Sequence, residues 1–182
     1  SATAEHMLTL LRDKRFTRID TALDYQVDLS GFIMTTSRSR KTTTFAGADG
    51  KLQTLYLGSR ESGSMYRIYD KALESGLPGT LWRIEEEKKF QPDEVWQFHL
   101  PFSDLYVVNP NPSNLSPVDY CCLVGLRNHP DMWGKLPTRQ LKKYRGMLKD
   151  AEKMTRLDPW PSETYISLAQ PLVDRLTYIM EL

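Results

Sequence analysis

Apolar and polar residues alternate along four stretches in the first half of the chain. These stretches are residues 15–25, 42–58, 64–71 and 81–89. Strict alternation places successive side chains on opposite faces, which is typical of a β-strand with one buried face. Between two strand-prone runs, the Asp49-Gly50 pair predicts a hairpin turn. The first half therefore predicts an antiparallel sheet of roughly five strands joined by short loops.

The second half of the chain has the wider apolar spacing of helices. Helices are predicted in four segments, residues 92–99, 116–127, 138–154 and 162–182. Ser116 and Ser162 are suitable capping residues, and Pro117 suits the first position of a helix. Residues 109–117 are rich in Asn, Pro and Ser and predict a loop between the two halves.

Together these elements predict an α+β fold with a central antiparallel sheet, helices on one face and the other face open. A chain of 182 residues fits one domain, or one domain with a small appendage. We expect residues 1–108 to form the core with the sheet. Residues 109–182 are expected to form a helical part that is packed on this core or appended to it.

Composition and charge indicate the class of protein and its compartment but do not indicate its function. Hydrophobic residues make up 40% and charged residues 26%, as in an ordinary soluble protein. The net charge is +1, so any nucleic-acid surface must come from local clusters. Adjacent cysteines, Cys121 and Cys122, favour a reducing compartment such as the cytoplasm and argue against a zinc site. No apolar run approaches the ~18 residues of a membrane span, so no membrane partner is expected.

Several common enzyme motifs are missing from the sequence. His6, His99 and His129 are scattered and never stand at metal-ligand spacing. No Gly-rich phosphate loop follows a predicted strand, and no GxSxG motif occurs. Zinc enzymes, P-loop NTPases and serine hydrolases therefore fit this chain poorly.

Carboxylates that share a strand face are the first candidate chemistry. Asp20 and Asp24 stand four apart on one predicted strand and point the same way, with the small Ala22 between them. Glu85 and Glu87 share one face of a later strand. Such a face is costly unless its carboxylates are solvated, paired or bound to a cation, and oxygen ligands suit Mg²⁺ or Mn²⁺.

A tyrosine between two cations is the second candidate. Arg67, Tyr69 and Lys71 share one face of a third predicted strand. Such cations stabilise phosphoryl charge and favour the phenolate that attacks a phosphodiester. A plainer interpretation stays open, because exposed sheet faces often carry charged residues in cross-strand pairs worth well under about 1 kcal/mol each.

Four sequence blocks, in order, resemble one protein family. They are RIDTALD (residues 18–24), TLYLGSRES (54–62), YRIYDKALE (66–74) and WRIEEEKK (82–89). They resemble the Rep-trans replication initiation factors, which are rolling-circle initiators of small plasmids, filamentous phages and integrative elements, together with related relaxases. The resemblance covers the first half of the chain and leaves the second half unmatched.

This resemblance implies a DNA nicking-closing endonuclease. In that family a tyrosine cleaves one DNA strand at the origin and stays joined to the 5′ phosphate, a divalent metal assists, and the freed 3′-OH primes replication. By motif, Tyr69 is the implied nucleophile. The implied ligands of Mg²⁺ or Mn²⁺ are Asp20, Asp24 and Glu85. The residues implied to grip phosphate or orient the tyrosine are Arg67, Lys71 and Arg83.

Two basic clusters predict DNA contacts beyond the nicking site. Residues 37–41 carry three cations, and residues 135–156 carry eight Lys or Arg against two acidic residues. The candidate phosphate-binding side chains are Arg38, Arg40, Lys41, Lys142, Lys143 and Arg145. Phosphate contacts give affinity without sequence preference, although solvated loops and helix faces are often basic too.

The implied partner is single-stranded or cruciform origin DNA in the cytoplasm of a bacterial host. A helicase and further copies of the chain are additional candidate partners. Two other functions stay open. One is a non-catalytic DNA- or protein-binding module on the same scaffold. The other is a metal-dependent nuclease that forms no covalent intermediate and uses Tyr69 only structurally.

Overall fold

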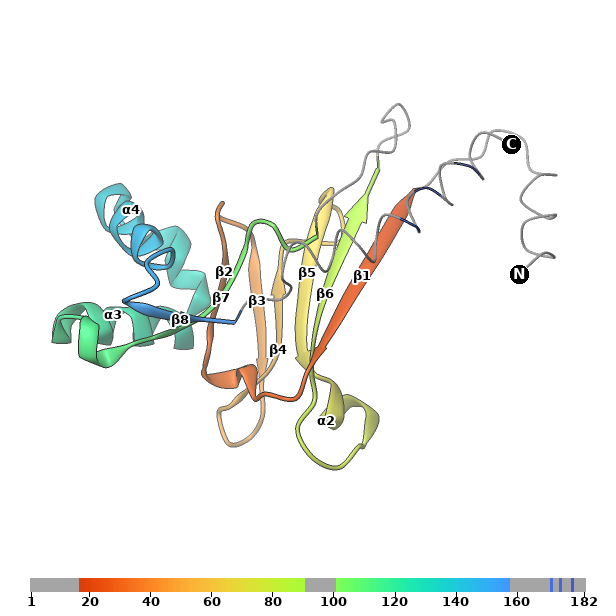
Figure 1. Ribbon diagram of the computed structural model, residues 1–182, viewed down its shortest axis with the longest axis horizontal. Coiled ribbons are helices and arrows are strands. Elements are labelled where there is room, and N and C mark those ends of the chain that lie inside the picture. The colour runs from red at the N-terminus through yellow and green to blue at the C-terminus, as the bar shows by residue number, and fades with distance from the viewer. Residues whose placement is uncertain (1–16, 91–100, 158–170, 172–173, 175–177, 179–182) are drawn as a thin grey trace.

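The largest element of the protein is a five-stranded antiparallel sheet, with strand order β1-β6-β5-β4-β3 (Figure 1). The structure is a computed structural model that describes residues 17–90 and 101–157 and positions 171, 174 and 178. The strands are β1 (Arg18–Tyr25), β3 (Thr42–Ala46), β4 (Leu52–Leu57), β5 (Ser64–Asp70) and β6 (Trp82–Lys89). The predicted α+β class and five-stranded sheet are confirmed.

Alternation along these strands gives the sheet one core face and one open face. In β6, Trp82, Ile84 and Glu86 are buried, and the residues between them are half-buried. Tyr66 and Ile68 of β5 join the same core. A fully buried Ile contributes about 1.5–3 kcal/mol, so this alternation fixes which face each residue takes.

Two turns of the sheet show how local sequence sets the connections. Gly50 has a φ of 78°, a left-handed conformation that glycine adopts without steric cost, in the predicted turn between β3 and β4. After β5, Asp70 accepts a hydrogen bond from the Leu73 amide and begins a short helix, α2 (Lys71–Ser75). The strand predicted through Lys71 therefore ends one residue earlier.

A second sheet covers the core face. Its strands are β2 (Ile33–Thr36), β7 (Leu105–Pro110) and β8 (Met154–Arg156), in the order β2-β7-β8. Met34 and Val107 from this sheet pack in the same core as Ile68 and Ile84. The sequence did not predict these strands, because all four residues of β2 are buried and show no alternation. The sheet joins strands from both sides of residue 108, and the division there stays a prediction.

Helices α3 (Pro117–Asn128) and α4 (Thr138–Met147) gather at the β2 side of the molecule, away from β1, whereas α2 lies at the end of β5 and β6 (Figure 1). Ser116 accepts a hydrogen bond from the Asp119 amide and begins α3, as predicted. Short 3-10 helices form at η1 (Leu29–Gly31), η2 (Pro112–Asn114) and η3 (Pro130–Lys135). No helix among the described residues is long and apolar enough to cross a membrane.

The helix predicted over residues 138–154 is shorter in the structure. It runs only through α4 (Thr138–Met147), and Met154 already begins β8. The reason is Asp150, whose side chain accepts the Glu152 amide hydrogen bond and so favours a turn over a further helical turn. The helix predicted at 92–99 lies outside the described residues, as does that at 162–182 apart from three isolated positions.

Candidate active site

Tyr69 lies on the open face of the five-stranded sheet, with Thr54 of β4 and Arg83 of β6 opposite it. It is nevertheless only 2% exposed. The Arg67 guanidinium carbon lies 3.9 Å from the centre of its ring, and the Lys71 ammonium lies 5.8 Å from it. These are distances of cation–π contacts. The predicted grouping of a tyrosine with two cations is therefore present, with Lys71 as the first residue of α2.

The phenol of Tyr69 donates a hydrogen bond to Glu85. Oη and Oε1 are 2.8 Å apart. Burial, this hydrogen bond and the charge of Glu85 raise the pKa of Tyr69 to about 12. A phenol with this pKa needs a base to lose its proton at neutral pH, and Glu85 stands at the distance a general base requires.

Glu74 of α2 binds both cations that cover Tyr69. Its carboxylate lies 2.8 Å from Lys71 Nζ and 2.6 Å from Arg67 Nη2. These two hydrogen bonds hold the pKa of Glu74 below its usual value. Sequence reasoning missed Glu74, although it belongs to the third family block. The available signal was Asp70, a capping residue that begins a helix at this point.

Asp24 is paired with the residue opposite it on β6. The register places it across from Arg83, whose Nε and Nη2 lie 2.6 and 2.7 Å from its two carboxylate oxygens. This bidentate pair holds the pKa of Asp24 below its usual value. Arg83 Nη1 also lies 3.9 Å from Glu85 Oε1, so the pair borders the Tyr69 site.

The three carboxylates predicted to bind a metal do not meet at one point. Asp20 pairs with Arg18 at 2.7 Å. Asp24 lies four residues further along the same strand, which is a rise of about 13 Å. Within residues 17–90 and 101–157, no three His, Cys, Asp or Glu side chains form a group that could hold an ion. As arranged, Asp20, Asp24 and Glu85 therefore do not fit a single cation, and metal binding stays a prediction.

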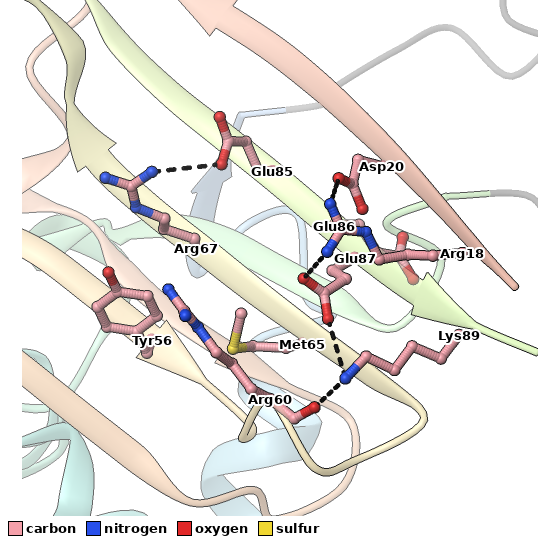
Figure 2. Close-up of a pocket in the computed structure, with 10 residues that line it drawn as sticks. All are labelled: Arg18, Asp20, Tyr56, Arg60, Met65, Arg67, Glu85, Glu86, Glu87 and Lys89. Carbon is pink, nitrogen blue, oxygen red and sulfur yellow. Dashed lines mark hydrogen bonds and ion pairs between the residues drawn. The ribbon is translucent and has the colours of Figure 1, made fainter.

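A pocket of about 330 Å³ opens on the same face, beside Glu85 (Figure 2). It shares Arg67 and Glu85 with the Tyr69 site. Its other lining residues include Arg18, Tyr56, Arg60, Met65, Glu87 and Lys89. Sequence reasoning placed several of these residues on the open face but could not predict a pocket, because its depth depends on how side chains of four strands pack.

The two basic clusters predicted for DNA come together. Arg145 of α4 donates a hydrogen bond from Nη2 to Ser39 Oγ at 3.0 Å. Arg38 and Lys41 of the loop are exposed, and so is Lys142 of α4. The structure thus joins a loop and a helix, over a hundred residues apart in sequence, into one basic surface.

Two of the predicted phosphate-binding side chains already have partners. Arg40 donates to Ser64 Oγ at 2.8 Å and pairs with Asp104 at 3.0 Å, with only 21% of its side chain exposed. Lys143 of α4 pairs with Asp119, which lies in the first turn of α3. These ion pairs give Arg40 and Lys143 structural roles, and DNA contact by either residue stays a prediction.

Comparison with known proteins agrees with the four sequence blocks. A replication initiation protein of Staphylococcus aureus is 35% identical over 162 residues, which are 85% of this chain and 51% of that protein. A second one from the same species is 32% identical over 154 residues, 80% of this chain and 48% of its own length. Over most of its own length, the chain is similar to replication initiation proteins. The resemblance noted from the sequence is confirmed.

The chain spans about half the length of the curated relatives it matches. No family model matches it. The structure of a rolling circle replication initiator protein from Geobacillus stearothermophilus aligns with 40% of this chain and 33% of that chain, with 19% identity and a TM-score of 0.29. A score this low does not allow geometry to be transferred between the two.

Proposed function

We propose that this chain nicks and rejoins one DNA strand to initiate rolling-circle replication, with Tyr69 as the nucleophile. The observation that carries the proposal is the hydrogen bond from Tyr69 Oη to Glu85 at 2.8 Å, under two cations and on the open face of the sheet. Kinship with replication initiation proteins supports the same activity.

The proposed reaction transfers a phosphoryl group from DNA to Tyr69. As Oη attacks the scissile phosphorus, Glu85 takes the phenolic proton. The bond from phosphorus to the 3′ oxygen breaks, and that oxygen leaves as a 3′-OH after receiving the proton from Glu85. The 5′ phosphate remains on the tyrosine, and attack by a 3′-OH reverses the same steps and rejoins the strand.

Arg67 and Lys71 are the proposed ligands of the scissile phosphate. Both already bind one anion, the Glu74 carboxylate, at 2.6 and 2.8 Å. A phosphate that replaced Glu74 would meet the same two cations directly above Tyr69. Arginine and lysine in such positions stabilise the charge that develops during phosphoryl transfer. Arg83 contributes through its contact with Glu85.

Dependence on Mg²⁺ or Mn²⁺ is a separate part of the proposal. It is supported by the resemblance to the family alone, since Asp20, Asp24 and Glu85 do not converge on one point. We expect EDTA to abolish nicking and Mn²⁺ to restore it. Nicking at the full rate in EDTA would remove the metal from the proposal and leave the tyrosine mechanism standing.

The basic surface of Arg38, Lys41, Lys142 and Arg145 is the proposed path of the DNA backbone. Replacing Arg38 and Lys41 with Ala should weaken binding to all sequences alike. Each lost phosphate contact should reduce the slope of log K against log salt by about one. Lys51→Ala is a control for the lost charge, because Lys51 is exposed in the turn at the other end of β3. An unchanged slope in the double variant would show that this loop only faces solvent.

A denaturing gel decides among the candidate functions. Wild type and Tyr69→Phe are incubated with labelled single-stranded and cruciform DNA from the origin of the replicon that encodes the chain. A covalent adduct that the Tyr69→Phe variant does not form supports the proposal. Cleavage without an adduct would instead indicate a nuclease that uses water, and binding without cleavage would indicate a non-catalytic module.

A further inference from the structure

The pocket beside Glu85 has a composition that suits one nucleotide of the cut strand. Arg67 and Glu85 belong both to this pocket and to the Tyr69 site. A DNA strand that places a phosphate over Tyr69 must therefore pass its neighbouring nucleotide over or into the pocket. Figure 2 shows that the pocket lies along β5 and β6. By the register of these strands, the pocket extends from Arg67 toward Ser64, away from Tyr69.

Apolar surface in the pocket is supplied by Tyr56 and Met65. Tyr56 stands opposite Arg67 on the neighbouring strand, and the Phe45 ring packs against it edge-on, with centroids 6.1 Å apart. Met65 is 8% exposed and lies between Tyr56 and β6 (Figure 2). A braced aromatic ring beside a thioether is a suitable support for the face of an unpaired base.

Arg60 is the cation of this pocket that is available to a ligand. Arg18 pairs with Asp20 and Glu87, and Lys89 pairs with Glu87. For the Arg60 guanidinium, by contrast, no hydrogen bond or ion pair is found among the described residues, and the residue is exposed. Its side chain extends from the β4–β5 turn alongside Met65 toward Tyr56 (Figure 2).

Hydrogen bonds to backbone carbonyl oxygens hold the turn that carries Arg60 in place. Lys89 Nζ donates a hydrogen bond to the Arg60 carbonyl oxygen, and Ser62 Oγ donates to the Ser59 carbonyl at 2.6 Å. The backbone of Arg60 is therefore fixed while its side chain stays unpaired. This combination is expected of a residue that binds a ligand, because little backbone ordering remains to be done on binding.

We propose that this pocket holds one unpaired base of the DNA strand next to the scissile phosphate, with the base stacked on Tyr56 and its acceptor edge at Arg60. The proposal rests on the proposed function, since it takes the DNA strand from Tyr69. Arginine can form two hydrogen bonds with acceptors on one base edge, as it does with guanine. The pocket thus selects the nucleotide at one position, whereas the basic surface of Arg38 and Lys41 binds any sequence.

The test uses the Tyr69→Phe variant of the full chain, so that binding is measured without cutting. Fluorescence anisotropy gives its affinity for single-stranded origin oligonucleotides in which one abasic site is moved stepwise across the nick position. We expect a single position beside the scissile phosphate where the missing base weakens binding roughly fivefold to a hundredfold, the range of one lost base–aromatic stack. Abasic sites elsewhere should change the affinity little.

Two further variants assign that penalty to the pocket. In Tyr56→Leu, added to Tyr69→Phe, the abasic penalty at that position should fall to near onefold, because the stack is gone. In Arg60→Ala, also added to Tyr69→Phe, the penalty should fall only in part, because the base still stacks on Tyr56. Tyr56→Phe keeps the ring and should keep the penalty. Arg38→Ala should weaken all oligonucleotides together and leave the penalty unchanged.

Failure of this inference is distinguishable from failure of the proposed function. A penalty that is equal at all positions, or that persists in both Tyr56→Leu and Arg60→Ala, would overturn the base pocket while adduct formation by wild type stands. A position-specific penalty without any adduct from wild type would keep the base pocket and overturn nicking.

Discussion

Tyr66 and Tyr69 stand three residues apart on β5 and face opposite sides of the sheet. They are 1% and 2% exposed, so both are almost fully buried. Each phenol donates a hydrogen bond to a carboxylate, Tyr66 to Asp104 on the core face and Tyr69 to Glu85 on the open face. Burial and the nearby carboxylates raise the pKa of each phenol above its usual value.

Each ring also lies under an arginine. The Arg40 guanidinium carbon is 5.2 Å from the centre of the Tyr66 ring, and that of Arg67 is 3.9 Å from the centre of the Tyr69 ring. One strand therefore carries the same three chemical groups twice. A tyrosine with a carboxylate and an arginine is thus no sufficient sign of a nucleophile.

The difference between the two groups lies in their surroundings. Tyr66 packs in the core beside Phe102, with ring centroids 6.3 Å apart, and the half-buried Asp104 pairs with Arg40. On the open face, the arginine over Tyr69 is held by Glu74, an exposed side chain that an anion can replace. A pocket also opens beside Glu85. Access for a phosphate, more than the local chemistry, distinguishes the candidate nucleophile from the structural tyrosine.

Replacing each tyrosine with Phe is the strongest test of this comparison. Tyr69→Phe should abolish the covalent adduct completely, because the attacking oxygen is gone. Tyr66→Phe should still form the adduct but unfold more easily, by about 1–3 kcal/mol, because the half-buried Asp104 loses a donor. Adduct formation on a denaturing gel and urea unfolding measure the two effects. Loss of the adduct in Tyr66→Phe at full stability would reverse the assignment.

The two carboxylates should differ in the same way. Glu85→Gln removes the proposed base and should slow nicking about 10²- to 10⁴-fold, with a partial recovery as pH rises and hydroxide replaces the base. Asp104→Asn should nick at nearly the wild-type rate and lose stability. Single-turnover nicking rates across a pH series check both variants. A pH profile of Glu85→Gln that parallels wild type would show that Glu85 acts in another way.

The two arginines extend the comparison to phosphate. Arg67→Ala should slow adduct formation roughly tenfold to a hundredfold, since a hydrogen bond to a charged group is worth about 1.5–3 kcal/mol. Arg40→Ala should lower the urea midpoint and leave the nicking rate of the folded protein nearly unchanged. Equal effects of both variants on the nicking rate would mean that the core arginine also serves the reaction.

Alternation of apolar and polar residues predicted which side chains lie on the open face of the sheet. It did not predict which residues pair across the strands. Tyr69, Arg67 and Glu85 were placed together because each strand has a period of two and one core face. Asp24 was predicted as a metal ligand from its strand face and the family resemblance. Its pairing with Arg83 was not foreseen, because a cross-strand partner depends on register. Register is set by long-range packing and turn geometry, so the pattern of a single strand does not reveal it.

The second sheet and Glu74 illustrate two other limits. All four residues of strand β2 are buried, including Thr35 and Thr36, so no alternation of apolar and polar residues marks it as a strand. Glu74 reaches Arg67 only because Asp70 ends β5 and begins α2. A residue one helical turn after a strand can thus bind a side chain of that strand, and strand alternation gives no sign of it.

Glu74 offers a smaller and more specific test of the open face. Glu74→Gln removes the anion that Arg67 and Lys71 now bind, so both cations become available to DNA. We expect affinity for single-stranded DNA to rise a few-fold and the slope of log K against log salt to steepen by up to about two. Glu61→Gln, on an exposed residue of the β4–β5 turn, is the matched control for the lost charge. Equal changes in the two variants would reflect net charge alone.

The last prediction concerns the raised pKa that Tyr66 and Tyr69 share, and its effect on stability at alkaline pH. In the unfolded chain both phenols lose their protons near about pH 10, whereas in the folded protein the pKa of Tyr69 is about 12 and that of Tyr66 is also raised. Above about pH 10 the folded state therefore binds more protons than the unfolded state. The free energy of unfolding should fall as pH rises, by at most about 1.4 kcal/mol per pH unit for each tyrosine, and be unaffected by these groups below that pH.

Urea unfolding at about pH 9, 10 and 11 should show a shallower fall in Tyr69→Phe and in Tyr66→Phe than in wild type. If a Phe variant keeps the wild-type slope, the fold does not hold that phenol in its neutral form. The hydrogen bond to the neighbouring carboxylate then does not raise the pKa of that phenol.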